Sequence, residues 1–158
     1  MARVDAADAS PGQITMACDL YGHLPRLQIV ASGVVAHLQT KPRSYEVLYS
    51  VFGAVDFTEP RALLPTAYAA LKPGGRLVFS TLAHFLSGDV AEAEVVSRQI
   101  AAKSADGEGA WMPRRVLREQ VWTKLLDEAG FTGISVQTWP AADGPRPAAT
   151  LLVSAICP

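Results

Sequence analysis

The chain has 158 residues, of which 49% are hydrophobic and 18% are charged, a composition typical of one globular domain and not of a disordered segment. Its 14 lysine and arginine residues and 15 aspartate and glutamate residues leave a net charge of −1, which excludes the positive surface that nucleic acid or an anionic membrane would need. The sequence has no apolar run near the about 20 residues of a membrane span and no signal-peptide pattern at its N-terminus. We therefore expect a cytoplasmic protein in which Cys18 and Cys157 are reduced thiols.

Strand-like and helix-like patterns alternate along the chain. The Ser-Pro-Gly-Gln sequence at 10–13 predicts a helix start in which Ser10 and Gln13 form a capping box. Lysine, proline and two glycines at 72–75 predict a tight turn, and Gly130 before Phe131 predicts a Schellman end for the last helix. The predicted strands are 3–8, 27–31, 45–52, 76–81, 134–138 and 150–156, and the predicted helices are 11–22, 34–38, 60–71 and 113–130.

Residues 86–113 break this alternation. The segment is polar and variable in character and contains Gly88, Gly107 and Gly109. We expect a mobile, lid-like segment with a helix at most in its middle, within a single domain that spans residues 1–158.

The order of elements indicates an α/β fold. Strands that alternate with helices form mainly parallel sheets covered on both faces, and the turn-rich link between the last two strands predicts an antiparallel C-terminal edge. Ligands of such sheets bind at the carboxyl ends of the strands. The sequence therefore places the chemistry at Asp8, Ser32–Gly33, Ser50–Gly53 and Thr81–Phe85.

Four segments in this order resemble class I S-adenosylmethionine-dependent methyltransferases of the small-molecule, type 11-like kind. The segments are VDAADASPGQI, YEVLYSVFGAVDFTEP, RALLPTAYAALKPGGRLVFST and the late LLDEAGF. The third segment is the most specific, and the resemblance covers residues 3 to 157. It implies a Rossmann-like fold, S-adenosyl-L-methionine as cofactor, and methyl transfer to an oxygen, nitrogen or carbon of a small molecule.

One part of the family pattern has no counterpart in this sequence. The family begins with a strand and a glycine-rich DxGxGxG loop, whereas this chain begins at the position of the second strand. The resemblance thus implies a sheet truncated at its N-terminus, without its central strand. Either the two remaining strands close the gap, or another chain or second copy supplies the piece, or the sequence is a gene fragment. Exposed strand edges favour association.

The resemblance assigns cofactor contacts to three strand ends. Asp8, with Ala9 beside it, matches the acidic residue that accepts hydrogen bonds from the ribose hydroxyls. Ser32, Gly33 and Val34 match the adenine-binding turn, although Gly33 replaces the aspartate that the family uses. Ser50, Val51 and Phe52 match the strand end beside the transferred methyl group. Each strand end also has an alternative without function. Asp8 would be a carboxylate that stabilises the following helix N-terminus, residues 32–34 would be a simple turn, and residues 50–52 would be core residues of a buried strand.

The substrate-facing residues follow from the same alignment. Phe52, Phe57, Phe85 and Trp111 would form the walls of the acceptor site, and His84 is a candidate general base because histidine titrates near neutral pH. A structural or solvated histidine is the alternative reading. No cysteine or histidine spacing indicates a metal site.

Two functions from different classes remain open at this stage. The first is a methyltransferase of small-molecule metabolism. The second is a non-catalytic remnant or interaction subunit that carries the fold and needs a partner chain to complete the sheet. The sequence does not identify the methyl acceptor or the oligomeric state.

Overall fold

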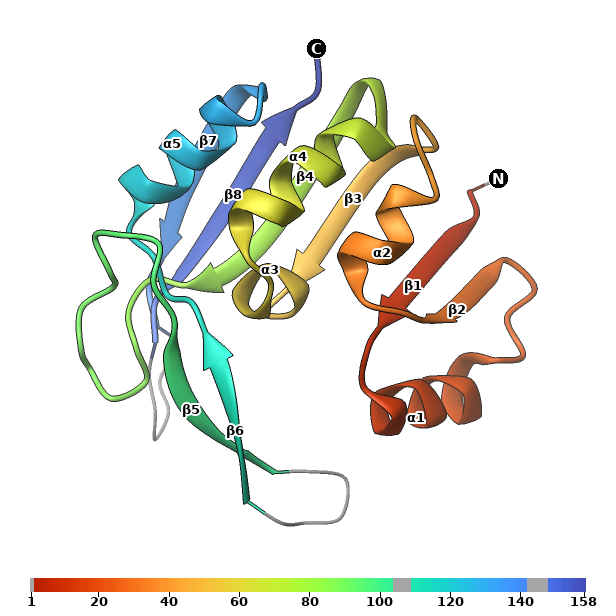
Figure 1. Ribbon diagram of the computed structural model, residues 1–158, viewed down its shortest axis with the longest axis horizontal. Coiled ribbons are helices and arrows are strands. Elements are labelled where there is room, and N and C mark those ends of the chain that lie inside the picture. The colour runs from red at the N-terminus through yellow and green to blue at the C-terminus, as the bar shows by residue number, and fades with distance from the viewer. Residues whose placement is uncertain (1, 104–108, 142–147) are drawn as a thin grey trace.

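The computed structural model describes residues 2–103, 109–141 and 148–158 of the chain (Figure 1). Its strands and helices follow the predicted alternation through the first half of the chain. In order they are β1 (Val4–Asp8), α1 (Pro11–Tyr21), β2 (Leu27–Ala31), α2 (Val34–Gln39), β3 (Tyr45–Val51), α3 (Ala54–Phe57), α4 (Pro60–Ala70), β4 (Leu71–Leu82), β5 (Arg98–Lys103), β6 (Gly109–Arg114), α5 (Glu119–Glu128), β7 (Thr132–Trp139) and β8 (Thr150–Ile156).

Among the described residues, the strands form three separate sheets. The pairs β1–β2 and β3–β4 are parallel, while β8 pairs antiparallel with both β4 and β7, which gives the order β3-β4-β8-β7 in the largest sheet. The strands β5 and β6 form an antiparallel hairpin of their own. The parallel pairs and the antiparallel C-terminal edge confirm the predicted fold class.

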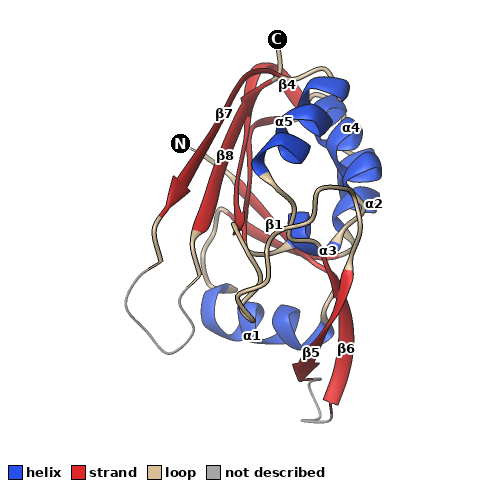
Figure 2. Ribbon diagram, turned by 90° about the vertical axis from the view of Figure 1, so that its left-hand side faces the viewer, coloured by secondary structure: helices blue, strands red, loops and turns tan. Residues whose placement is uncertain are grey.

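Helices lie on both faces of this arrangement. Figure 2 shows α2, α4 and α5 together on one side of the four-stranded sheet, with α1 apart from them. The connection from β1 to β2 runs sideways away from β3. The connection from β2 to β3 runs in the opposite sideways direction, past β1. Right-handed crossovers therefore place α1 and α2 on opposite faces.

The expected sheet is interrupted between β1 and β3. In the part of the chain that the structure describes, these two strands share no ladder, and each pairs on its other side only. The possibility that the remaining strands close the gap is therefore wrong for the described residues. The interruption lies where the resemblance implies a missing central strand.

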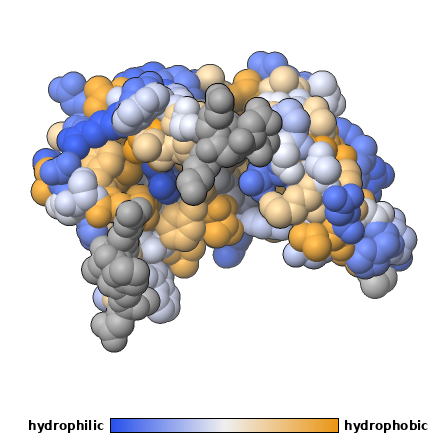
Figure 3. Space-filling model, turned by 90° about the horizontal axis from the view of Figure 1, so that it is seen from below, coloured by the Kyte–Doolittle hydropathy of each residue, from blue (hydrophilic) through white to orange (hydrophobic). Residues whose placement is uncertain are grey.

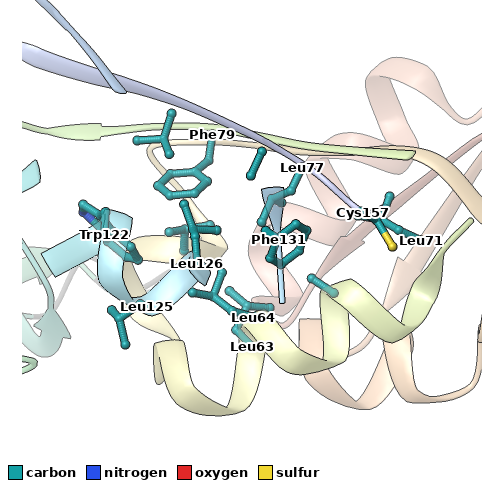
Figure 4. Packing of buried hydrophobic residues seen from close by; sticks show 14 of the residues in the cluster. Leu63, Leu64, Leu71, Leu77, Phe79, Trp122, Leu125, Leu126, Phe131 and Cys157 are labelled. Carbon is teal, nitrogen blue, oxygen red and sulfur yellow. The ribbon is translucent and has the colours of Figure 1, made fainter. Parts of the chain in front are cut away.

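The hydrophobic core lies between the four-stranded sheet and helices α4 and α5. Figure 4 shows Phe79 of β4 pointing toward Trp122 and Leu126 of α5, and the rings of Phe79 and Trp122 meet edge to face with centroids 5.0 Å apart. Tyr68 and Phe131 pack in the same way at 5.4 Å. Aromatic pairs in this geometry contribute about 0.5–1.5 kcal/mol beyond the burial of their area.

The turn at 72–75 joins α4 to the paired part of β4. Gly74 has a φ of +78°, and a Cβ on Gly75 would lie 2.8 Å from the carbonyl oxygen of Lys72. Both positions therefore require glycine for physical reasons. At the end of α5, Gly130 has a φ of +95° and the N–H of Phe131 donates to the carbonyl of Leu126, which confirms the predicted Schellman ending.

Three local predictions are wrong. The described part of 86–113 contains the strands β5 and β6 in place of a helix, and residues 104–108 of that segment lie outside the described residues. Pro113 belongs to β6, and α5 begins only at Glu119, because the N–H of Arg115 donates to the carbonyl of Asp56 and keeps this stretch extended. Ser10 is the N-cap residue of α1 but makes no side-chain capping bond.

Candidate functional site

The carboxyl ends of β1 to β4 meet at one edge of the molecule, as the fold class requires. Figure 3 looks onto this edge and shows a hydrophobic patch beside an indentation. The predicted site residues divide into two groups, one at the ends of β1 and β2 and one at the ends of β3 and β4, with the interruption of the sheet between them.

Asp8 is the last residue of β1 and is exposed. Its Oδ1 accepts a hydrogen bond from the N–H of Ser10 at 2.7 Å, so the Asp8 side chain holds the turn that leads into α1. A carboxylate has four acceptor positions. Asp8 can therefore hold this turn and still accept the hydroxyls of a ligand, while Ala9 is exposed beside it.

The turn after β2 lies directly against Asp8. The N–H of Ser32 donates to the Asp8 carbonyl at 3.0 Å, and its hydroxyl donates to the carbonyl of Gly33. Gly33 is the N-cap of α2 and Val34 is the first helical residue. A Cβ on Gly33 would meet nothing within 4 Å, so a planar ligand group can approach this backbone closely. Asp8, Ala9, Ser32, Gly33 and Val34 thus form one contiguous surface.

The end of β3 carries a backbone strain. Phe52 has a φ of +46°, and its N–H donates to the Ser80 carbonyl of β4 at 3.0 Å. A non-glycine residue in this region costs about 1–3 kcal/mol, and such residues cluster at functional sites. The hydroxyl of Ser50 accepts a long bond from the N–H of Val55 at 3.5 Å. Ser50 is half-buried, while Val51 and Phe52 are exposed, so this strand end can contact a ligand.

The residues expected to face the acceptor do not form one wall. His84 accepts a hydrogen bond from the N–H of Ala149 through Nε2 at 3.1 Å, so its Nδ1 is the protonated nitrogen and donates to the carbonyl of Phe85 at 3.0 Å. Because both ring nitrogens are hydrogen-bonded, His84 links the segment after β4 to the segment before β8. Its role as a general base stays a prediction that would require these bonds to break.

The aromatic candidates have separate environments. Phe85 is buried, and the guanidinium of Arg98 lies 4.2 Å from its ring centroid. Phe57 lies 5.6 Å from the guanidinium of Arg114. Trp111 is 71% exposed on β6. Of the substrate-facing candidates, Phe52 and Phe57 are therefore the ones that adjoin the strand end of the proposed site.

Sequence reasoning missed a buried ion pair next to this edge. Asp56 of α3 is fully buried, and its Oδ2 accepts bonds from Nη2 of Arg114 at 2.6 Å and from Nε at 3.1 Å. Burial raises the pKa of the Asp56 carboxyl, and the nearby Thr81 hydroxyl and the Arg114 guanidinium oppose that rise. The pair ties the β5–β6 hairpin to the end of β3, and a lone aspartate in the sequence gives no signal for it.

A second missed cluster bridges the interruption at the opposite end of the strands. Tyr45 of β3 donates through its hydroxyl to Oδ2 of Asp5 on β1 at 2.8 Å, and Nε2 of His37 on α2 lies 2.8 Å from the same hydroxyl. Burial raises the pKa of Tyr45 to about 12, and the hydrogen bond to Asp5 adds to the rise. This cluster lies at the amino ends of β1 and β3, away from the predicted site.

Two surface hollows lie away from the predicted site residues. One of about 460 Å³ is lined by Arg3 and residues 25–28, and another of about 410 Å³ lies over α5. Neither is lined by a predicted site residue. Within the described ranges, no group of three histidine, cysteine, aspartate or glutamate side chains could hold a metal ion. No described helix is long and apolar enough to cross a membrane.

The order of strands and helices, with paired parallel strands and an antiparallel C-terminal edge, defines the class I S-adenosylmethionine-dependent methyltransferase fold. The chain is similar to the crystal structure of an S-adenosylmethionine-dependent methyltransferase from Mesorhizobium loti, with a TM-score of 0.69, 21% identity, and 98% of this chain and 80% of that one covered. For a methyltransferase from Methanosarcina mazei the values are 0.66, 13%, 97% and 81%.

A third similar structure has ligands bound. It is the 1,6-didemethyltoxoflavin-N1-methyltransferase of Burkholderia thailandensis with 1,6-didemethyltoxoflavin and S-adenosylhomocysteine, at a TM-score of 0.62 and 20% identity, covering 98% of this chain and 60% of that one. No family model and no curated protein matches the sequence. At these identities the likeness shows the fold alone.

Proposed function

We propose that the chain provides two parts of an S-adenosylmethionine-dependent methyltransferase site that acts on an oxygen, nitrogen or carbon of a small molecule. The observation that carries the proposal is that Asp8, in contact with the Ser32–Val34 turn, and the strained Phe52 lie at the carboxyl ends of strands on the same edge of this fold. Three structures of the same fold come from methyltransferases, and one of these binds a small heterocycle as acceptor.

Each group has a distinct part in this proposal. Asp8 holds the ribose hydroxyls, and the open backbone of Ser32, Gly33 and Val34 lies along the adenine. Ser50, Val51 and Phe52 lie toward the sulfonium, with Phe52 and Phe57 on the acceptor side. The cofactor supplies an activated methyl group for in-line displacement, a reaction that depends largely on positioning. A general base is therefore not essential to the proposal.

The cofactor contacts of this chain alone are incomplete. The resemblance implies contacts from a glycine-rich loop and from an adenine-binding aspartate, and the described residues provide neither. If each set is worth about 1.5–3 kcal/mol, the loss is about 3–6 kcal/mol, or roughly two to four decades of affinity. A family-like micromolar site would then bind at about 0.1–10 mM.

Calorimetric titration with S-adenosylhomocysteine tests this proposal. We expect weak binding by the isolated chain that Asp8→Ala reduces further, whereas Asp19→Ala, which removes an exposed carboxylate of α1, leaves it unchanged. Equal binding by the two variants would contradict the role of Asp8. Low-micromolar binding by the unmodified chain would show that another loop replaces the missing contacts.

A second candidate function is a non-catalytic subunit of the same fold. Two observations favour it: both nitrogens of His84 bond to backbone groups, and the sheet is interrupted between the two groups of site residues. In either case we propose that a companion chain or a second copy occupies the interruption. A methyl-transfer assay of the completed assembly separates the two functions.

A further inference from the structure

The β5–β6 hairpin has two faces, and its register assigns each residue to one of them. Successive side chains of a strand point to opposite sides, so the residues of every second cross-strand pair share a face. On the first face these pairs are Arg98 with Arg114, Ile100 with Met112, and Ala102 with Ala110. Trp111, which pairs with Ala101, lies on the second face.

The two arginines show that the first face is turned toward the strand ends. The guanidinium of Arg114 donates to Asp56 and lies 5.6 Å from the ring centroid of Phe57, and both partners belong to α3, directly after β3. The guanidinium of Arg98 lies 4.2 Å from the ring centroid of Phe85, which follows β4. Figure 1 shows the hairpin continuing past the carboxyl ends of both strands. We call the face that carries these arginines the inner face.

The inner face is apolar beyond the arginines. Ile100, Ala102 and Ala110 are half-buried, and Met112 is 39% exposed. Their side chains have no hydrogen-bond donor. Met112 lies two residues, or about 6.6 Å along a strand, from the arginine that packs on Phe57. The apolar surface at the end of β3 therefore continues onto the hairpin.

The outer face has different surroundings. Trp111 is 71% exposed there, although its ring is large and apolar. Gln99, Ala101 and Pro113 share this face and are exposed as well. Side chains on the outer face point away from the strand ends, so a ligand bound between the strand ends and the hairpin would not meet Trp111.

The charges beside the inner face are already neutralised. Three arginines in the hairpin or directly after it each have a carboxylate partner. The pairs are Arg98 with Glu92 at 2.6 Å, Arg114 with Asp56 at 2.6 Å, and Arg115 with Glu59 at 3.0 Å. A charged group of a ligand would lose hydration at this surface without gaining one of these arginines as a free partner. The surface therefore suits an uncharged ligand.

We infer that Ile100 and Met112 form a wall of the acceptor site beside Phe57, and that the acceptor presents an uncharged aromatic ring to them. Thioether sulfurs contact aromatic rings favourably, and Phe57 can add a contact between rings. The inference deepens the proposed function and rests on it for the reaction, whereas the wall itself is defined by the register of the hairpin. Trp111 has no part in this wall.

Methyl NMR spectra of the full chain, labelled with carbon-13 at the methionine and isoleucine methyl groups, test the wall. The probe is 2-naphthol, an uncharged double ring with one hydroxyl, and 2-naphthoate is the matched anion. Addition of 2-naphthol should shift the methyl signals of Met112 and Ile100 and leave that of Met16, a more exposed methionine on α1, in place. The anion should bind roughly tenfold more weakly.

Two neighbouring residues of β6 give a matched pair of variants. Met112→Lys places a charge on the inner face and should weaken 2-naphthol binding roughly tenfold, as the methyl signal of Ile100 reports. Trp111→Lys makes the same change on the outer face and should leave the affinity unchanged. Circular dichroism checks that both variants fold, and if Met112→Lys does not, Met112→Ser replaces it with the same expectation.

Four results would overturn the inference. The first two are that 2-naphthol shifts neither hairpin methyl up to its solubility limit, or that it shifts Met16 at lower concentration than Met112. The others are weaker binding in Trp111→Lys than in Met112→Lys, and binding of 2-naphthoate as tight as that of 2-naphthol.

The S-adenosylhomocysteine titration is read separately from the 2-naphthol titration. Cofactor binding that depends on Asp8, without any shift by 2-naphthol, would refute the wall and leave the proposed function intact. A shift of Met112 by 2-naphthol without any cofactor binding would refute the proposed function and leave an apolar ring site on the hairpin.

Discussion

The hydroxyl of Tyr45 donates to Oδ2 of Asp5 at 2.8 Å, although the two residues lie on strands that share no ladder in the described part of the chain. His37 of α2 meets the same hydroxyl, so the three side chains connect β1, α2 and β3 at one point. Hydrogen bonds between side chains therefore connect β1 to β3, whereas backbone hydrogen bonds connect the paired strands. The relative position of the two groups of site residues depends on this cluster.

Replacing Tyr45 with phenylalanine should therefore destabilise the protein. The substitution removes a hydrogen bond to a half-buried carboxylate, which is worth about 1.5–3 kcal/mol, and it leaves Asp5 and His37 without that partner. Chemical denaturation at pH 7 measures the loss. Tyr21→Phe, at an exposed position of α1, is the matched control and should have little effect.

The raised pKa of Tyr45 gives this variant a second signature at alkaline pH. The folded-state pKa of about 12 lies above the reference value of 10.0, so the stabilisation from the neutral hydroxyl is complete below pH 10 and is lost as the pH rises toward 12. The free-energy difference between the unmodified protein and Tyr45→Phe should shrink over that window. A difference that stays constant from pH 9 to 12 would contradict the assignment.

Phe52 offers a test of the strain at the end of β3. Its φ of +46° suits glycine better than any residue with a Cβ. Phe52→Gly and Phe52→Ala both remove the ring, but only glycine relieves the strain, so we expect the glycine variant to be more stable by about 1 kcal/mol. The same two substitutions at Tyr49, inside the strand, should give the opposite order, as thermal unfolding would show.

The fold could be predicted because local signals and hydrophobic patterning agree over most of the chain. Strand 45–52 is β-branched and aromatic, and the glycines at 74, 75 and 130 occupy positions where a side chain would clash or strain the backbone. The β5–β6 hairpin could not be predicted in this way. Its attachment through Asp56 and Arg114 joins residues 58 positions apart, and no local pattern records such a contact.

Only part of the candidate site could be predicted from the sequence, because some of its contacts also join residues far apart in the chain. Asp8 and Gly33 could be proposed as candidates because Asp8 ends a strand and Gly33 follows one, each within a short motif. The hydrogen bond between His84 and Ala149 depends on the pairing of β8 with β4. The sequence alone does not give the register of that pairing. The Asp5–Tyr45–His37 cluster likewise depends on contacts between residues far apart in the sequence.

Gly33 provides a gain-of-function test of the proposed adenine turn. A side chain there would meet nothing within 4 Å, and the φ of −61° is open to any residue. Gly33→Asp should therefore fold normally and supply a carboxylate acceptor where the resemblance implies one. An ionised hydrogen bond of about 1.5–3 kcal/mol would raise the affinity for S-adenosylhomocysteine roughly tenfold to hundredfold. Gly33→Asn is the control for charge, and unchanged calorimetric affinity in both variants would count against the turn.

The Asp56–Arg114 pair gives the sharpest prediction for stability, because its two halves are not equivalent. Asp56 is fully buried, whereas the side chain of Arg114 keeps 13% exposure. Arg114→Met leaves an uncompensated buried carboxylate, which typically costs about 3–5 kcal/mol. Asp56→Asn removes the buried charge and lets the guanidinium turn toward solvent, so we expect a smaller loss. The double variant should resemble Asp56→Asn more than the sum of the two single variants.

The pH dependence of these variants fixes the sign of the effect. Burial raises the pKa of Asp56 above its reference value of 3.8, so its contribution to stability is complete below that value, where the carboxyl is neutral, and declines as the pH rises through the folded-state pKa. Without Arg114 the charged form loses its partner, so the decline continues to higher pH and the total loss is larger. The destabilisation by Arg114→Met should therefore be small near pH 4 and largest at pH 7, while that of Asp56→Asn should show no such increase. Urea denaturation at both pH values measures this, and a loss for Arg114→Met that is equal at pH 4 and pH 7 would mean that the guanidinium stabilises the hairpin by packing on Phe57 and not by neutralising Asp56.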